Sequence, residues 1–180
     1  MKNSKSLIAA IVFAAASLGS TAFAADISSA PKALAFVDTS AFFGDAFAMG
    51  NASNTFADHF TFSVTGTTPT NLDAIVSSIS RTASVGLDIT GLSLYTSGGT
   101  LVSSGASMST GAIDVWTLKS DSLAAGNYYV RVNGTMVSTT SGSFGGAIML
   151  APVPEPETYG MMLAGLGLVG FLARRRRNTQ

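Results

Sequence analysis

The sequence contains no cysteine, and charged residues make up only 11% of its 180 positions. Without thiols the chain has no disulfides, no thiolate nucleophile and no cysteine-ligated zinc, so its fold must rest on a hydrophobic core. It has one histidine, His59, which argues against a zinc site. A phosphate-binding loop with the glycine and lysine spacing of nucleotide-binding proteins is also missing. These absences argue against several common classes of catalytic centre.

Glutamate is absent between Ala25 and Val153, whereas serine and threonine supply 36 of these 129 residues. Because strong helix formers are scarce, the composition predicts a β fold. The formal net charge of zero conceals a segregation, since six of the ten cations lie near the two ends of the chain. The middle carries eight aspartates against four cations, a net charge of −4, which argues against nucleic acid or anionic lipid as a partner.

Residues 1–24 have the pattern of a secretory signal peptide. Two lysines precede an apolar run of 12 residues at positions 7–18, and the small residues Ala22 and Ala24 follow. Small side chains at these two positions suit the narrow pockets of signal peptidase, so we expect cleavage after Ala24. An uncleaved membrane anchor is the alternative.

The other end of the chain combines a proline spacer, an apolar helix and a cationic terminus. Pro154 and Pro156 favour an extended backbone that holds Glu155 where a receptor could bind it. The apolar run from residue 159 to 173 is 15 residues, about 22 Å of helix against a hydrocarbon core of about 30 Å. We therefore expect a short transmembrane helix that spans only with bilayer thinning or snorkelling. A cytoplasmic stop would be formed by Arg174, Arg175, Arg176 and Arg177.

This combination of Pro-Glu-Pro, a glycine-rich apolar helix and terminal arginines resembles the PEP-CTERM sorting signal. The resemblance implies recognition by an exosortase, an integral-membrane cysteine transpeptidase of Gram-negative bacteria that make exopolysaccharide. The chain would be transiently anchored in the inner membrane, cleaved near the motif, and delivered to the cell surface or the medium. A plain C-terminal membrane anchor is the alternative.

The middle of the chain has the period-two alternation of β-strands. It is clearest from Phe56 to Val64, where the apolar side chains share one parity and His59 has the other. The apolar face changes parity at Gly91, which predicts a β-bulge there. The sequence Ser-Gly-Gly-Thr at positions 97–100 predicts a hairpin.

Seven or eight strands at short spacing predict an antiparallel β-sandwich, either jelly-roll or immunoglobulin-like, over residues 25–152. Signal segments at 1–24 and 153–177 would flank it as an N-terminal signal helix and the short transmembrane helix. We expect a first strand at 33–38, followed by a loop that bears phenylalanines. Residues 71–81 fit both helical and strand spacing, and their composition favours a strand.

The middle also resembles the FxDxF group of PEP-CTERM proteins through Phe56, Asp58 and Phe60. No chemistry is assigned to this motif by the resemblance. Because Asp58 has the parity of the buried phenylalanines, we expect it to accept amide hydrogen bonds at the entrance of a strand. The alternative is a calcium ligand that acts with Asp38 or Asp45.

Catalytic candidates are weak. A Ser/His/Asp triad would have to use His59, which lies on the predicted outer face of a strand and has no nucleophile motif near it. Trp116 is a candidate for stacking on a sugar, but its apolar neighbours favour a place in the core.

We therefore expect a non-enzymatic protein without cofactor, processed by signal peptidase and exosortase and associated with the exopolysaccharide matrix of a biofilm. The matrix association comes from the resemblance alone. The alternative is a carbohydrate- or calcium-binding adhesion module. A secreted hydrolase would need a concave pocket with two titratable groups near His59.

Overall fold

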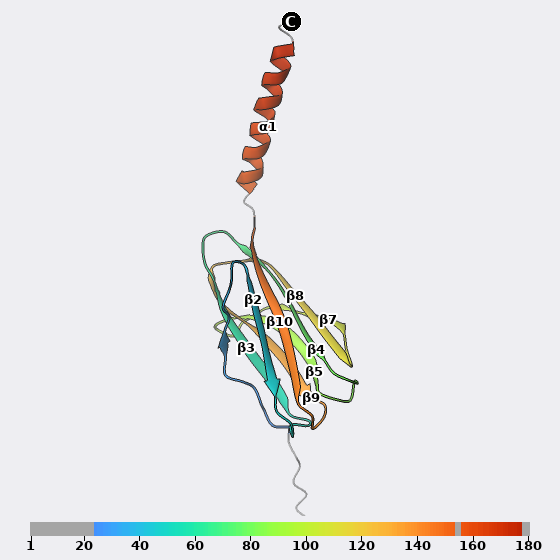
Figure 1. Cartoon of the computed structure of the whole chain (residues 1–180). Helices are drawn as coiled ribbons and strands as arrows, with labels where there is room; N and C mark the ends of the chain where they lie inside the picture. Colours follow the sequence, from blue (N-terminus) through green and yellow to red (C-terminus); the bar gives the residue numbers. More distant parts are fainter. Residues whose placement is uncertain (1–23, 154–155, 178–180) are drawn as a thin grey trace, which may run out of the picture.

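The computed structural model describes residues 24–153 and 156–177, which form a two-layer β-sandwich followed by a helix (Figure 1). The predicted mainly β class and the two sheets of the sandwich are confirmed. The expected signal helix, with Ala22, lies outside the described residues. The elements are β1 (Lys32–Ala33), β2 (Ser40–Phe47), β3 (Thr55–Val64), β4 (Thr70–Ile79), β5 (Leu87–Thr96), β6 (Leu101–Ser104), β7 (Ala106–Ser109), β8 (Ile113–Leu123), β9 (Gly126–Met136), β10 (Gly142–Pro152) and α1 (Pro156–Arg177).

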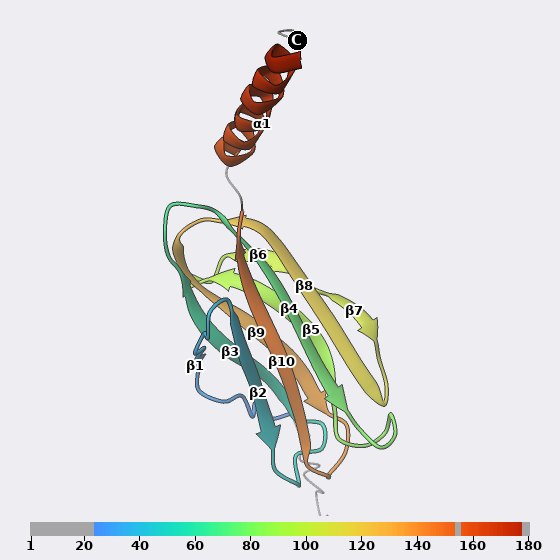
Figure 2. The same cartoon turned by 45° about the horizontal axis from the view of Figure 1, so that its top comes forward.

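The two layers are five-stranded sheets (Figure 2). Sheet A has the order β1-β3-β9-β5-β6, and sheet B has the order β2-β10-β4-β8-β7. Neighbouring strands pair antiparallel except β1, which runs parallel to β3. The predicted hairpin at 97–100 joins β5 to β6, where the amide of Thr96 donates to the carbonyl of Thr100 at 2.9 Å.

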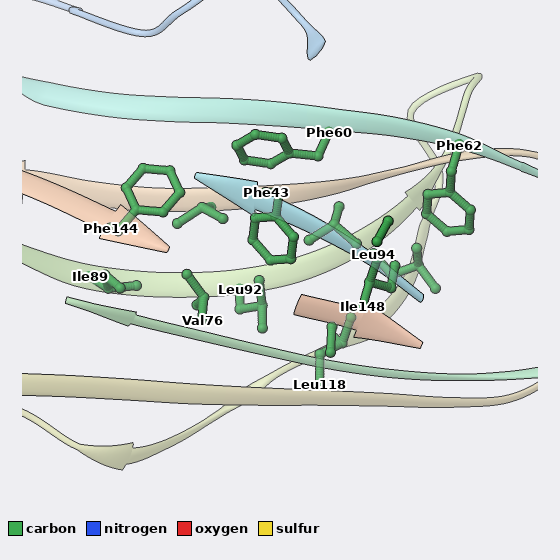
Figure 3. Packing of buried hydrophobic residues seen from close by; sticks show 14 of the residues in the cluster. Phe43, Phe60, Phe62, Val76, Ile89, Leu92, Leu94, Leu118, Phe144 and Ile148 are labelled. Carbon is green, nitrogen blue, oxygen red and sulfur yellow. The ribbon is translucent and has the colours of Figure 1, made fainter. Parts of the chain in front are cut away.

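The core lies between the sheets because alternate residues of each strand point inward. Phe60 of β3 and Leu94 of β5 face Ile148 of β10 and Leu118 of β8 across this layer, and Figure 3 shows them packed together. All four are at most 1% exposed. The inward parity predicted for β3 is therefore confirmed.

Two finer predictions also hold. The pairing of β5 with β9 shifts register between Ile89 and Gly91, so the predicted bulge lies at the position where the apolar parity changes. The ambiguous segment at 71–81 forms most of β4, and its alternating burial is that of a strand.

The predicted number of strands was too low, since the described residues contain ten. The main reason is that β6 and β7 are a nearly continuous segment that passes from sheet A to sheet B at Gly105. A Cβ at this position would lie 2.7 Å from the carbonyl oxygen of Thr117 and 2.9 Å from that of Leu92, which explains the glycine at the crossing.

The prediction of a loop for the phenylalanine-bearing segment is wrong. The segment forms strand β2. Phe43 and Phe47 point into the core, whereas Phe42 is 84% exposed. An exposed phenylalanine next to a buried one hides the period-two pattern. The strand expected at 33–38 is also shorter than predicted, since β1 ends at Ala33 and only an isolated bridge from Val37 to Ser40 follows.

The expected C-terminal helix is present as α1, with Glu157 in its first turn and arginines at its end. This arrangement complements the helix dipole. Its expected transmembrane character is not borne out, since no helix within 24–153 and 156–177 combines the length and the apolar character needed to cross a membrane. The apolar run of 15 residues is followed directly by the four arginines.

Candidate functional site: sorting tail and polar clusters

The sorting tail begins where the sandwich ends. β10 runs to Pro152, and the amide of Val153 donates to the carbonyl of Pro69 at 2.8 Å. Pro154 and Glu155 lie outside the described residues, and Pro156 is the first residue of α1. Of the three predicted recognition residues, only Pro156 is described, and it is helical, so the extended backbone expected from the prolines is not found at this residue.

Helix α1 extends away from the sandwich (Figure 1), and its described apolar side chains are open to solvent. Tyr159, Met161 and Phe171 are 54%, 76% and 65% exposed, and a Cβ on Gly165 or Gly167 would meet no atom within 4 Å. An apolar helix whose side chains are uncovered by the domain needs an apolar surrounding of another kind. Arg174 and Arg175 are also exposed.

The N-terminal segment directly after the predicted cleavage position is an ordered part of the fold. Ala24 is exposed. The amide of Ala25 donates to Oδ1 of Asn54 at 2.9 Å, and its carbonyl accepts the amide of Thr55 at 3.0 Å. The chain is thus attached to the start of β3 from residue 25 onward.

The Phe-x-Asp-x-Phe motif lies on β3 with all three side chains inward. Phe56, Asp58 and Phe60 are 3%, 2% and 1% exposed. Oδ1 of Asp58 accepts the amide of Ser29 at 2.8 Å, as expected, but Asp58 lies within β3 and not at its entrance. The motif is therefore a structural element in which two core rings flank a buried carboxyl group.

Asp58 lies in a polar cluster at the open edge of the sandwich, between β2 and β3. Burial raises its pKa to about 6 from the usual 3.8, and the neighbouring carboxyl group of Asp45 raises it further, against the lowering effect of the Ser29 amide and Lys32. Nζ of Lys32 lies 2.7 Å from Oδ2 of Asp45. Burial alone would also raise the pKa of Asp45, but hydrogen bonds from Lys32, Ser29 and Ala46 outweigh it and lower that pKa.

The calcium alternative is only partly matched by this geometry. Asp45 does lie beside Asp58, as that alternative requires. The ammonium group of Lys32, however, already supplies a positive charge next to Asp45. Asp38 is in the turn before β2, with a φ of 55°. Within residues 24–153 and 156–177, no group of three or more histidines, cysteines or carboxylates could hold a metal ion.

A second buried carboxylate, Asp114 of β8, was not singled out from the sequence. It is 1% exposed and accepts hydrogen bonds from Oγ of Ser78 at 2.9 Å, the amide of Ile89 at 3.1 Å and the amide of Gly111 at 3.0 Å. It therefore joins β4, β5 and β8. The turn glycine three residues earlier is the only local signal that could have indicated this role.

His59 lies on the outer face of sheet A, as predicted, within a row of aromatic rings. Its ring centroid is 4.5 Å from that of Tyr129, which stacks on Tyr95 at 5.2 Å, and the guanidinium of Arg131 lies 4.7 Å from the centre of Tyr95. Burial and then Arg131 lower the pKa of His59. All four side chains of this row are partly exposed.

A groove of about 720 Å³ adjoins this row and is also lined by Thr61, Ser63, Ser97 and Asn127. Oγ of Ser63 donates to Oδ1 of Asn127 at 2.7 Å. The described lining contains His59 but no carboxylate. Among the described lining residues, the groove therefore does not bring a carboxylate together with His59.

Trp116 is half-buried and packs against the core, and its indole Nε1 donates to the carbonyl of Ile89 at 2.9 Å. Trp116 thus lies at the margin of the core, against which it packs as its apolar neighbours predict.

Residues 152–177 match the family model described as the PEP-CTERM protein-sorting motif. The predicted sorting signal is thereby confirmed, and it implies export and processing by an exosortase. The match does not reach Phe56, Asp58 and Phe60, so the resemblance to the FxDxF group stays a prediction. No curated protein matches the chain.

Proposed function

We propose that the chain is the precursor of a non-catalytic structural protein that an exosortase detaches from the inner membrane and delivers to the cell surface or the medium. The observation that carries this proposal is the sorting motif at 152–177, placed on an apolar, solvent-exposed helix directly after the last strand. The sandwich is complete at Pro152, so cleavage near the motif would remove the tail without removing a strand.

Signal peptidase would act first, after Ala24. The hydrogen bonds of Ala25 support this position, because the mature chain would then start with the residue that is bonded to Asn54 and Thr55. The exposed Ala24 supports access.

The structural role in an exopolysaccharide matrix goes further and rests on the resemblance. It is compatible with the groove on the outer face of sheet A, where Thr61, Ser63 and Asn127 can exchange hydrogen bonds with hydroxyl groups of a glycan. Inactivation of the exosortase in the producing cell tests the delivery step. The chain should then accumulate in the inner membrane with its tail intact, and undiminished release of processed protein would contradict the proposal.

A second candidate is a carbohydrate-binding adhesion module that uses the groove of sheet A. Tyr129 and His59 beside Asn127 combine aromatic surface with hydroxyl and amide groups, which is the chemistry that sugars require. A glycan array and a calcium titration on the released protein separate the two candidates. Binding that Tyr129→Ala abolishes would favour the module, and an absence of binding favours the structural role.

A further inference from the structure

Residues 25–34 form a strap along one edge of β3. The amide of Ile27 donates to the carbonyl of Thr55 at 2.9 Å, and the amide of Leu34 donates to the carbonyl of Thr61 at 2.8 Å. An uncovered edge of this length would offer its amides and carbonyls to another chain. The strap therefore protects sheet A at the side where the sandwich is open.

Side chains of the strap and of two strands meet at the middle of this edge. Oγ of Ser28 accepts the amide of Ala57 at 2.7 Å, and Asp58 accepts the amide of Ser29 at 2.8 Å. Lys32 pairs with Asp45 of β2, which belongs to the other sheet. The strap is thus linked to both layers through two carboxyl groups.

The second oxygen of Asp58 has no proton donor when the group is ionised. Asp58 is 2% exposed, and its Oδ2 is buried without a hydrogen-bond partner among the described residues. The neighbouring carboxyl group is that of Asp45, and its negative charge disfavours ionisation of Asp58, because two adjacent carboxylates repel each other. A proton between them removes the repulsion and supplies the missing donor.

We propose that Asp45 and Asp58 share one proton across the open edge of the sandwich and, with Lys32, form a proton-dependent clasp that fastens the N-terminal strap. The charged groups that face Asp58 are Asp45 from β2 and Lys32 from β1. Lys32 neutralises the carboxylate that remains, so the closed clasp carries no net charge. Because Lys32 is already held by Asp45, a proton fits the cluster better than a metal ion.

The direction of the pH dependence follows from the pKa of Asp58, which is about 6 in the closed state against 3.8 for an ordinary aspartate. A raised pKa stabilises the closed state fully below 3.8, and this stabilisation is lost as the pH rises to about 6. Asp45 has a lowered pKa, so its own contribution is lost only at more acid pH. The two carboxyl groups titrate as a coupled pair. The clasp is therefore strongest near pH 4.

Hydrogen–deuterium exchange on the full chain in detergent micelles tests the clasp. The readout is the protection factor of the Ser29 and Ala57 amides, corrected for intrinsic exchange, between about pH 4 and about pH 8. We expect protection to fall about tenfold per pH unit up to about pH 6, about a hundredfold in all, and then to level off. A flat profile over this range would overturn the proposal.

Asp58→Asn supplies the key comparison, because its amide can accept from Ser29 and donate to Asp45 without a proton. Its protection should be independent of pH and should exceed that of the wild type at neutral pH. Asp73→Asn, at the exposed pair with Lys119, is the matched control and should keep the wild-type profile. A pH-dependent profile in Asp58→Asn would overturn the proposal.

Two further measurements keep the test decisive if that variant does not fold. Asp45→Asn offers ionised Asp58 a hydrogen-bond donor and removes the neighbouring negative charge. The fall in amide protection should therefore occur at lower pH, and a fall at the wild-type pH would count against the clasp. Calcium chloride added to the wild type at neutral pH should leave protection unchanged. A calcium-dependent rise that Asp45→Asn abolishes would make the cluster a cation site instead.

Discussion

The ring of Phe56 on β3 stacks on the ring of Phe144 on β10, with centroids 5.5 Å apart and planes only 6° from parallel. These strands belong to different sheets, so the pair joins the two layers. Phe47 adds a ring 4.5 Å from Phe56, and Phe60 meets Phe144 edge-on at 6.1 Å. Aromatic contact thus holds the layers together beside the polar cluster of Asp58.

Phe60→Ala should lower the free energy of unfolding by about 3–5 kcal/mol, because it leaves a cavity in the middle of the aromatic group. Thr61→Ala, one residue away on the outer face, should change it by about 0.5 kcal/mol or less. Denaturant unfolding of both variants provides the measurement. Equal small effects would show that the inward face has been assigned wrongly.

Gly134→Ala should destabilise the fold by about 1–3 kcal/mol through overpacking. The added Cβ would collide with the ring of Phe56 and lie 2.6 Å from the carbonyl oxygen of Asp88. Gly145→Ala on β10 is the matched control, since a Cβ there meets no atom within 4 Å. Thermal unfolding should separate the two variants, and similar midpoints would contradict the close packing at Gly134.

Asp114→Asn should cost about 2–4 kcal/mol, because the new amide group faces backbone donors and leaves at least one of them unsatisfied. Asp73→Asn removes an exposed charge at the pair with Lys119 and should cost about 0.5 kcal/mol or less. Chemical denaturation gives both values. A mild effect at Asp114 would mean that its three hydrogen bonds contribute little to stability.

The inward faces could be predicted from the sequence wherever polar and apolar residues alternate with few interruptions. Phe56 to Val64 shows this, and Gly91 marks the parity change because the bulge adds one residue to β5. The prediction failed at β2, where the outward side chain of Phe42 is also apolar. A single sequence does not distinguish a buried phenylalanine from an exposed one beside it.

Some parts of the candidate sites could be predicted from the sequence, and others could not. The sorting tail is contiguous in the sequence, so its parts could be recognised together. The parity of Asp58 predicted its burial, but its partners Ser29 and Asp45 lie on other segments and meet it only because β2 and the strap close the same edge. Asp114 is likewise separated from Ser78 by 36 residues. Spatial pairing of this kind has no local signature.

Replacement of Pro154, Glu155 and Pro156 by alanine should leave export intact but keep the uncleaved chain in the inner membrane. Alanine removes both prolines and the Glu155 carboxylate together, while residues 157–177, which hold the rest of α1 and its arginines, are unchanged. Fractionation and immunoblotting of the producing cells provide the measurement. Replacement of the four arginines by serine should instead weaken retention before processing, because no charge then halts translocation.

The intact mass of the protein recovered from the cell surface or the medium tests the central claim most directly. Processing at both ends predicts a chain that starts at Ala25, ends near Pro154–Pro156 and lacks the segment from Arg174 to Arg177. A surface-exposed mature protein that still carries these arginines would contradict exosortase processing and favour a permanent C-terminal anchor.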